Sequence, residues 1–189
     1  MKQYRVAVVG AMGAVGTEMI KTLEQRNYPV SELVPLDIPA NAGKTVTFRG
    51  APVQVRAAQA GAFQGVDVAI FSAGADASKV LAPLAASEGA IVVDNSSQWR
   101  MDPSVPLVVP EVNPQALDGH KGIIANPNCS TIQMVVALKP IHDAYRIKRV
   151  VVSTYQAVSG TGGAAIAELT NQARQFTEGK PIAWWFYED

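Results

Sequence analysis

Three glycines directly after the first apolar segment restrict the possible folds of this chain more than any other feature. They follow a short β-rich run, Tyr4–Val9, and lead into a segment whose apolar residues recur at helical spacing, Ala14–Arg26. Glycine permits a tight turn, lets the backbone approach a pyrophosphate and lets the helix pack closely on the strand. Because the loop follows a strand and opens a helix, it predicts dinucleotide binding, with a simple tight turn as the alternative. The candidate cofactor-binding residues of this loop are Gly10, Ala11, Met12, Gly13, Ala14, Val15 and Gly16.

Strand-like and helix-like segments alternate along the rest of the chain. Several strand-like segments are apolar throughout, which is typical of parallel strands covered on both faces. The pattern predicts an α/β fold with a Rossmann-like, doubly wound and mostly parallel sheet. The expected strands after the first are Leu33–Leu36, Val66–Phe71, Ala90–Asp94, Val105–Val109, Ile123–Ala125 and Val150–Thr154, with a hairpin of Thr45–Phe48 and Val53–Val55. The expected helices after the first are Ala77–Ser87, Ser130–Tyr145 and Gly163–Glu178.

Single residues refine two of these elements. Asp76 is a good N-cap for the helix Ala77–Ser87, and Gly89 is a good stop signal for it. Pro35 has no backbone N–H, so Leu33–Leu36 is expected at an edge or an end of the sheet.

The predicted strands end in polar or glycine-bearing turns, at Gly10, Ser72, Asn95 and Asn126. In an open α/β sheet, ligands bind outside the carboxyl ends of the strands, so these turns mark the expected binding edge. One of the turns either packs under a nicotinamide ribose or merely reverses the chain. It consists of Ser72, Ala73 and Gly74.

Asp37 is the candidate for the acidic residue that follows such a glycine loop by ~20 positions. In that role its carboxylate would hold a ribose 2′-hydroxyl and favour NAD. The alternative is a solvated loop residue ahead of Pro39, and the sequence does not separate the two.

Cys129 is the only cysteine of the chain and stands at the start of a helix-like segment. Pro127 biases the residue before it away from helical conformation, while Asn128 and Ser130 are both good N-cap types. The thiol is therefore expected at a helix N-terminus, where free backbone N–H groups and the helix dipole favour a thiolate. A nucleophile is the favoured interpretation, and a small buried hydrophobe is the alternative.

Composition excludes several classes of partner. Sixteen basic and sixteen acidic residues cancel, and no charge run predicts a nucleic acid or an anionic membrane as a partner. A single cysteine excludes an internal disulfide framework and a multi-cysteine metal site, so we expect no metal. The first strand begins at residue 4 and no apolar run approaches ~20 residues, so neither a signal peptide nor a membrane span is expected. These features predict a cytoplasmic protein that binds small molecules.

Six segments, taken together and in this order, resemble aspartate-semialdehyde dehydrogenase. They are Gly10–Gly16, Phe71–Gly74, Val93–Ser97, Val108–Asn113, Asn126–Met134 and Ser153–Gly160. The resemblance extends from Tyr4 to about Gln175, and the segments around Cys129 and Gln156 are its most specific parts. N-acetyl-glutamyl-phosphate reductase catalyses the same kind of reaction but has a different sequence around its cysteine. It is therefore the second candidate family.

The resemblance implies reduction of β-aspartyl phosphate to aspartate β-semialdehyde, with NADPH as reductant and release of inorganic phosphate, in lysine, threonine and methionine biosynthesis. Cys129 would be the nucleophile that forms an acyl-thioester, Asn128 would orient it or stabilise the oxyanion, and Gln156 would position the substrate. Arg100, with Asn95, would bind the phosphate. Ser159 and Gly160 would lie near the cofactor, with a flexible turn as their alternative.

The resemblance also implies two domains and a homodimer. Residues 1–128 would form the dinucleotide-binding domain, and residues 129–189 an incomplete start of an α+β catalytic and dimerisation domain. Family members continue well past Asp189, so the chain is expected to be an N-terminal half, inactive alone. A nucleotide-binding remnant without turnover is the non-enzymatic alternative.

The sequence departs from the family in three places. Ala40 stands where many NADP-dependent members have an arginine, and Asp37 would repel a 2′-phosphate unless Lys44 offsets it. Neither histidine of the chain, His120 or His142, falls in a segment that matches the family's acid/base histidine. The aromatic residues Trp184, Trp185, Phe186 and Tyr187 near the chain end are expected to promote association.

Overall fold

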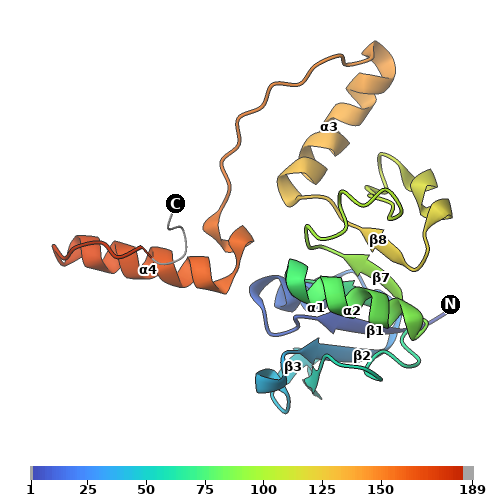
Figure 1. Cartoon of the computed structure of the whole chain (residues 1–189), viewed down its shortest axis with the longest axis horizontal. Helices are drawn as coiled ribbons and strands as arrows, with labels where there is room; N and C mark the ends of the chain where they lie inside the picture. Colours follow the sequence, from blue (N-terminus) through green and yellow to red (C-terminus); the bar gives the residue numbers. More distant parts are fainter. Residues whose placement is uncertain (1, 185–189) are drawn as a thin grey trace.

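The computed structural model describes residues 2–184, and Figure 1 shows their arrangement. A six-stranded sheet has the order β5-β2-β1-β6-β7-β8, and every neighbouring pair in it is parallel. After β1 the chain adds β2 on one side of it and later β6 on the other, which is the topology of a doubly wound fold. The Rossmann-like prediction is therefore confirmed. The strands are β1 (Tyr4–Val9), β2 (Val30–Asp37), β5 (Arg56–Ala57), β6 (Val68–Phe71), β7 (Ile91–Asp94) and β8 (Ile123–Ala125).

Helices cover both faces of this sheet. The side chains of β1 alternate between the two faces, and each face forms a hydrophobic core with a helix. Ala7 and Val9 pack in the core under α2 (Ala75–Ser87), whereas Val6 and Val8 pack in the core under α1 (Ala14–Gln25). The α2 core also contains Phe63, Phe71, Ala82, Ala85 and Val92. The α1 core also contains Ile20, Leu23, Leu33, Val46 and Phe48.

The predicted hairpin forms a separate antiparallel pair, β3 (Thr45–Phe48) with β4 (Ala51–Gln54). Its two turn residues, Arg49 and Gly50, both have positive φ, at 50° and 76°. Two positive φ values make the kind of two-residue turn whose twist matches that of the flanking strands. The hairpin thereby directs Val46 and Phe48 into the core under α1.

Pro35 lies nearly at a sheet edge although β2 has a neighbour on each side. Leu36 turns its carbonyl toward β1, where the N–H of Gly10 donates to it at 2.8 Å. Successive residues alternate in direction, so Pro35 faces the other side, and β5 pairs there only from Leu36 onward. The missing N–H of Pro35 therefore leaves no ladder bond unmade.

Three predicted elements differ from the structure. Val105–Val109 is not a strand, and only Leu107 forms an isolated parallel bridge, with Ala125. Val150–Thr154 belongs to no strand of residues 2–184. Asp76 lies in the first turn of α2 and is not its cap, because Gly74, with φ of 84°, takes that position.

The part of the chain after β8 extends away from the sheet, as Figure 1 shows. It consists of α3 (Cys129–Tyr145), an extended segment 146–157, a short 3-10 turn η3 (Val158–Thr161) and α4 (Gly163–Thr177). No residue of α3 is buried, and α4 buries only Ala165 and Glu168. Trp184 is exposed, while Trp185, Phe186 and Tyr187 lie outside the described residues. None of the helices among residues 2–184 is both long and apolar enough to cross a bilayer.

Two further 3-10 turns lie within the sheet-bearing part. They are η1 (Pro39–Asn41), directly after β2, and η2 (Pro114–Gly119), ahead of β8.

Candidate active site

The polar turns after β1, β6, β7 and β8 lie side by side, because these four strands are consecutive neighbours in the sheet. All of them are parallel, so their carboxyl ends share one edge. The backbone pairing continues into the turns: the N–H of Asn95 bonds the Phe71 carbonyl at 3.0 Å, and the N–H of Asn126 bonds the Asp94 carbonyl at 2.8 Å. The four turns therefore share one edge of the sheet, and ligand binding at this edge stays a prediction.

Two glycines are required by the packing where β1 meets α1: Gly10 in the loop and Gly16 in the first turn of the helix. Gly10 has φ of 83°, and a Cβ on it would lie 2.5 Å from the carbonyl oxygen of Ser72. A Cβ on Gly16 would lie 2.0 Å from the carbonyl oxygen of Gly10. The absence of side chains lets α1 begin close against the end of β1. Gly13 is the N-cap of α1, whose first N–H groups have no partner within the helix and can face an anion.

A cavity of about 380 Å³ lies beside this loop. Its volume is in the range of small-molecule sites, and the end of β1 and the start of α2 border it. These residues fit a dinucleotide: a glycine turn, a helix N-terminus and an acidic side chain meet at one cavity. Six predicted cofactor residues line the cavity, namely Gly10, Met12, Gly13, Asp37, Ser72 and Ala73.

The other predicted residues of the two turns do not line this cavity. Ala11 is fully buried in the core under α1, and Gly16 packs against Gly10. Ala14 begins α1, while Val15 borders a separate hollow beside Tyr28. Gly74 caps α2. Their part in the fold is to shape the loop and the two helix starts.

Asp37 ends β2, and its side chain is tied to the glycine loop. One carboxylate oxygen accepts the N–H of Met12 at 2.8 Å. The other accepts the N–H of Ile38 at 2.8 Å and the side-chain amide of Asn41 at 2.7 Å. Asp37 is only 7% exposed, so the alternative of a solvated loop residue is wrong.

Cys129 is an exposed free thiol at the first residue of α3. The helix starts there because the Asn128 side chain accepts the backbone N–H of Ser130 at 3.0 Å, as an N-cap does. The helix thus begins one residue earlier than predicted, and the alternative of a buried hydrophobe is wrong. The side-chain N–H of Gln156 donates to Cys129 Sγ at 3.4 Å, across 27 positions of sequence.

The thiol borders a second cavity, of about 430 Å³, between the start of α3 and the segment that leads to η3. Ser159 and Gly160 line it with Gln156, and neither of them lines the glycine-loop cavity. A Cβ on Gly160 would lie 2.9 Å from the Gln156 side-chain nitrogen, so the glycine leaves room for that side chain. The remaining lining residues are Ser130, Gln133, Thr154, Tyr155 and Ala157.

Arg100 and Asn95 meet beside the segment that leads to the thiol. The Arg100 guanidinium donates to the Asn126 carbonyl at 3.0 Å and to the Asn95 carbonyl at 2.9 Å. The Asn126 side-chain amide donates to the Asn95 side-chain oxygen at 2.7 Å. Two carbonyls therefore hold the guanidinium plane and leave its other N–H groups for a ligand. Neither Arg100 nor Asn95 lines the cavity at Cys129.

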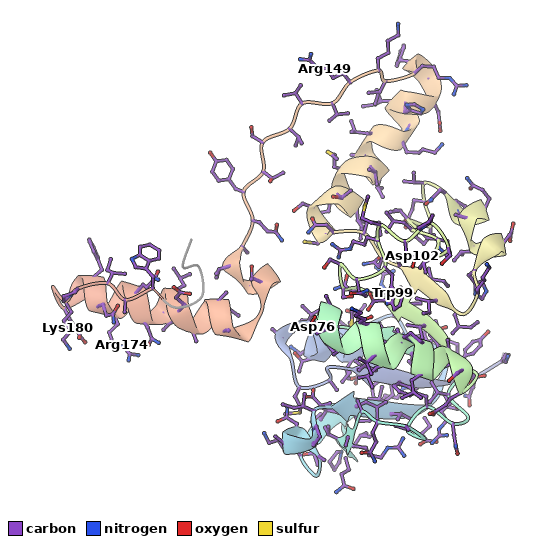
Figure 2. The ribbon with its side chains drawn as sticks, viewed as in Figure 1. Asp76, Trp99, Asp102, Arg149, Arg174 and Lys180 are labelled. Carbon is purple, nitrogen blue, oxygen red and sulfur yellow. The ribbon has the colours of Figure 1, made fainter. Side chains whose placement is uncertain are left out.

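A buried polar network that sequence reasoning missed supports the loop before Arg100. Asp94 has no exposed surface and accepts the Ser78 hydroxyl at 2.9 Å and the Ser96 hydroxyl at 2.5 Å. The indole N–H of Trp99 donates to the Ser78 oxygen at 2.9 Å, and Figure 2 shows Trp99 beside the start of α2. The acidic residue inside an otherwise apolar strand, Val92–Asp94, was the available signal.

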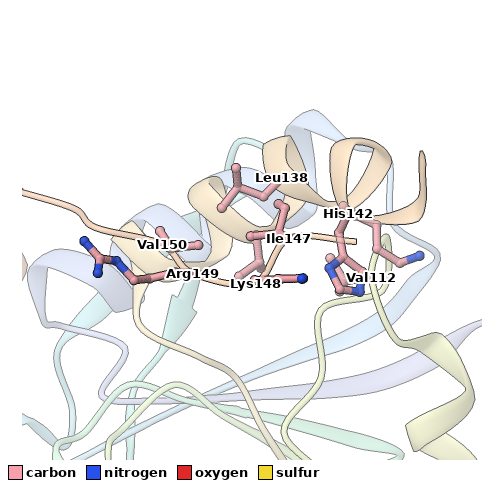
Figure 3. Close-up of a pocket in the computed structure, with 9 residues that line it drawn as sticks. Val112, Leu138, His142, Ile147, Lys148, Arg149 and Val150 are labelled. Atoms are coloured by element: carbon pink, nitrogen blue, oxygen red, sulfur yellow. The ribbon is translucent and has the colours of Figure 1, made fainter. Parts of the chain in front are cut away.

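A third cavity, of about 340 Å³, lies at the far end of α3 and is drawn in Figure 3. His142 lines it with Lys139, whose hydrogen bond lowers the pKa of Asp143 from its ordinary value. His120 is elsewhere, where its ring accepts the N–H of Gly122 at 3.2 Å. Neither histidine lines the cavity at Cys129.

The fold and this edge define a nucleotide-binding α/β protein with an accessible thiol at a helix start. Residues 5–120 match the sequence model of the semialdehyde dehydrogenase NAD-binding domain, and residues 138–186 match that of the semialdehyde dehydrogenase dimerisation domain. The chain therefore belongs to the semialdehyde dehydrogenase family.

Relatives in this family bear the name suggested by the sequence motifs. The chain is 59% identical over 182 residues to aspartate-semialdehyde dehydrogenase of Aquifex aeolicus, covering 95% of this chain and 54% of the relative. It is 56% identical over 169 residues to the Bacillus subtilis enzyme of the same name, covering 89% and 49%. The chain thus spans about half the length of the curated relatives it matches.

Solved structures agree with this relationship. Aspartate semialdehyde dehydrogenase II of Vibrio cholerae, complexed with ASA, superposes with a TM-score of 0.95 at 46% identity, covering all of this chain and 57% of that one. Aspartate semialdehyde dehydrogenase of Candida albicans, with NADP, gives a TM-score of 0.66 at 26% identity, covering 77% and 48%. The resemblance to aspartate-semialdehyde dehydrogenase is therefore confirmed.

Proposed function

We propose that this chain carries the cofactor cavity and the nucleophile of an aspartate-semialdehyde dehydrogenase. The reaction is the reduction of β-aspartyl phosphate to aspartate β-semialdehyde, in the biosynthesis of lysine, threonine and methionine in the cytoplasm. The observation that carries the proposal is the contact between Gln156 and Cys129, because it brings an amide donor to an exposed thiol at a helix N-terminus. The names of the relatives support the choice of substrate.

Cys129 is the proposed nucleophile. Its sulfur lies on the first residue of α3, at the positive end of the helix. The thiolate attacks the acyl carbon of β-aspartyl phosphate, a C–S bond forms, and the C–O bond to phosphate breaks with release of inorganic phosphate. When bound, the nicotinamide supplies a hydride to that carbon. The C–S bond then breaks, and the thiolate is regenerated as the aldehyde leaves.

The residues around the thiol hold it and the substrate. Asn128 fixes the position of the sulfur because it caps α3 through the Ser130 N–H. The side-chain N–H of Gln156 donates to the thiol, and the acyl carbon of the substrate would bond to the same sulfur. The Gln156 amide would therefore lie next to the substrate carbonyl. Arg100, with its plane held by two carbonyls beside Asn95, is the proposed phosphate ligand.

The glycine loop and the cavity beside it are the proposed cofactor site. The start of α1, with Gly13 as its N-cap, has backbone N–H groups that would bind the pyrophosphate. Ser72 and Ala73 form the wall at the end of β6. The resemblance implies NADPH as the cofactor. NADH is the alternative, because the charge of Asp37 would repel a 2′-phosphate.

Residues 1–128 are the proposed cofactor domain, and residues 129–189 the proposed part of a catalytic and dimerisation domain of a homodimer. A match to a dimerisation domain over residues 138–186 supports the second assignment. Neither histidine borders the cavity at Cys129, so the 189 residues alone are expected to form the thioester without efficient turnover. Loss of general acid–base catalysis typically lowers the rate ~10²–10⁴-fold.

The covalent step is the sharpest test of this proposal. The chain is mixed with β-aspartyl phosphate and its intact mass is measured, with the Cys129→Ser variant as the matched control. We expect an aspartyl adduct on the chain and none on the variant, and release of one phosphate per adduct. A chain that reacts with iodoacetamide at Cys129 but acquires no aspartyl adduct would contradict the proposed substrate.

The non-enzymatic alternative is a nucleotide-binding remnant. It predicts cofactor binding without an adduct, and no phosphate-dependent reduction of NAD or NADP by aspartate semialdehyde when the rest of the enzyme is supplied. Absorbance at the reduced nicotinamide band measures that reaction.

A further inference from the structure

We propose that Asp37 makes the cofactor cavity selective for NAD over NADP. The inference rests on the proposed nucleotide site and deepens it. Asp37 lines the cavity at the end of β2, beside the glycine loop that would hold the pyrophosphate. An acidic side chain at this place in a doubly wound sheet reaches the ribose 2′-hydroxyl, whereas a 2′-phosphate needs a cation there.

The hydrogen bonds of Asp37 leave one place for a hydroxyl. A carboxylate has about four lone-pair sites. One oxygen accepts Ile38 N–H and the Asn41 amide, at 2.8 and 2.7 Å. The other accepts only the Met12 N–H, at 2.8 Å, among the described residues. Among the described residues, the oxygen that accepts the Met12 N–H of the glycine loop therefore retains one free acceptor site.

These bonds also hold the negative charge in place. Three N–H donors bind the two carboxylate oxygens, and Asp37 is nearly buried. Asp37 is thus fixed against the loop rather than free to turn into solvent. A 2′-phosphate at this end of the cavity would meet a carboxylate that cannot move away.

No cation on the cavity wall offsets that charge. The lining residues among residues 2–184 include no lysine, arginine or histidine. Lys44 is the nearest candidate along the chain, but its ammonium group donates to the Asn41 side-chain oxygen at 2.6 Å, and Lys44 does not line the cavity. The Asn41 side chain therefore stands between Lys44 and Asp37, since its amide nitrogen bonds the carboxylate.

A purely structural role is the alternative for Asp37. In that role the carboxylate would only tie the glycine loop to η1, and its loss would weaken NAD and NADP binding equally. Selectivity therefore separates the two roles, whereas stability or overall affinity does not.

The experiment compares ligands that differ only in the 2′-phosphate. Calorimetric titration of the 189-residue chain gives the affinities for NAD and NADP, and for ADP-ribose and its 2′-phosphate, which lack the nicotinamide. We expect the ligands without the phosphate to bind at least about tenfold more tightly, because a 2′-phosphate would lie beside a like charge. Equal affinity, or preference for NADP, would overturn the inference.

Two variants assign the effect to Asp37. Asp37→Asn keeps the size of the side chain and removes its charge, and is expected to bring the affinity ratio close to one. Asp67→Asn is the matched control, because Asp67 also accepts a backbone N–H, from Arg5 at 2.8 Å, but does not line the cavity. The control is expected to keep the wild-type ratio, and loss of selectivity in both variants would contradict the assignment.

A variant with a cation added at the cavity gives a second test, which still applies if Asp37→Asn does not fold. Ile38 lines the cavity and is 61% exposed, so Ile38→Arg is tolerated by the fold and brings a guanidinium to the cavity mouth. We expect the affinity for NADP to rise several-fold with little change for NAD. If none of the four ligands binds to the wild-type chain, the proposed nucleotide site itself is refuted, whereas binding without discrimination refutes only the selectivity.

Discussion

Gln156 donates a side-chain N–H to Cys129 Sγ across 3.4 Å, and the chain between them runs through the whole of α3 and the extended segment. The N–H donor acts directly on the sulfur, so this contact links the reactivity of Cys129 to a residue of a different segment. Gly160 leaves room for this contact, because a Cβ there would lie 2.9 Å from the Gln156 side-chain nitrogen and the amide would have to shift.

Gln156→Leu is therefore expected to slow alkylation of Cys129 by iodoacetamide at neutral pH about three- to tenfold, the equivalent of one hydrogen bond. Gly160→Ala is expected to do the same without removing Gln156, because it displaces the amide. Gln133→Leu is the control, since Gln133 borders the same cavity but makes no hydrogen bond to the sulfur among the described residues. A rate that falls equally in all three variants would exclude a specific role for Gln156.

Asn128 is expected to act through the start of α3. Asn128→Ala removes the cap, which typically costs ~0.5–2 kcal/mol, and the first turn carrying Cys129 would fray. Slower alkylation of Cys129 and lower helical circular dichroism are the expected results. Asn128→Ser retains a capping oxygen and should leave both measurements close to wild type. If serine and alanine behave alike, capping is not how Asn128 acts.

Gly16 is expected to be intolerant of any side chain. A Cβ there would lie 2.0 Å from the backbone oxygen of Gly10, so the loop or α1 must shift. Gly16→Ala is expected to lower the free energy of unfolding by about 1–3 kcal/mol and to weaken nucleotide binding. Gly119→Ala, where a Cβ meets nothing within 4 Å, should change stability by less than about 0.5 kcal/mol. Urea denaturation measures both, and a tolerant Gly16 would contradict the described loop.

Ser78 is expected to stabilise the loop that carries Arg100. Ser78→Ala leaves the buried Asp94 carboxylate short of one donor and the Trp99 indole N–H without its acceptor. Leaving such groups unpaired costs about 1–3 kcal/mol, which urea denaturation would detect. Ser87→Ala on the same helix is the control, because its hydroxyl is exposed and bonds only the Leu84 carbonyl. Equal stability of the two variants would show that the network contributes little.

Local signals in the sequence predict the first half of the fold well. Tyr4–Val9 and the helix from Ala14 are found at the predicted places, because glycine punctuation and apolar periodicity act over a few residues. The prediction of a strand at Val105–Val109 is wrong, because an apolar run does not show whether a neighbouring strand is there to pair with it. Only Leu107 forms a bridge, with Ala125. Gly74 displaces Asp76 as the cap of α2 because the turn after β6 needs positive φ, which no composition rule reveals.

The candidate site divides in the same way. The glycine loop and the helix start at Cys129 follow from local chemistry, whereas the contact with Gln156 came only from a family resemblance. The bonds from Ser78 and Trp99 are tertiary, so no periodicity announces them. Burial of Asp37 likewise depends on how β2 meets the glycine loop, which the sequence left open.

The lack of burial along α3 has a consequence for the thiol that it carries. A helix of 17 residues with no buried side chain is marginal in water, so its amide hydrogens should exchange with solvent far faster than those of β1 and β6. The electrostatic environment of Cys129 exists only while that first turn is wound. Its observed reactivity is then an average over wound and unwound molecules, and any contact that buries a face of α3 would raise it without touching the sulfur.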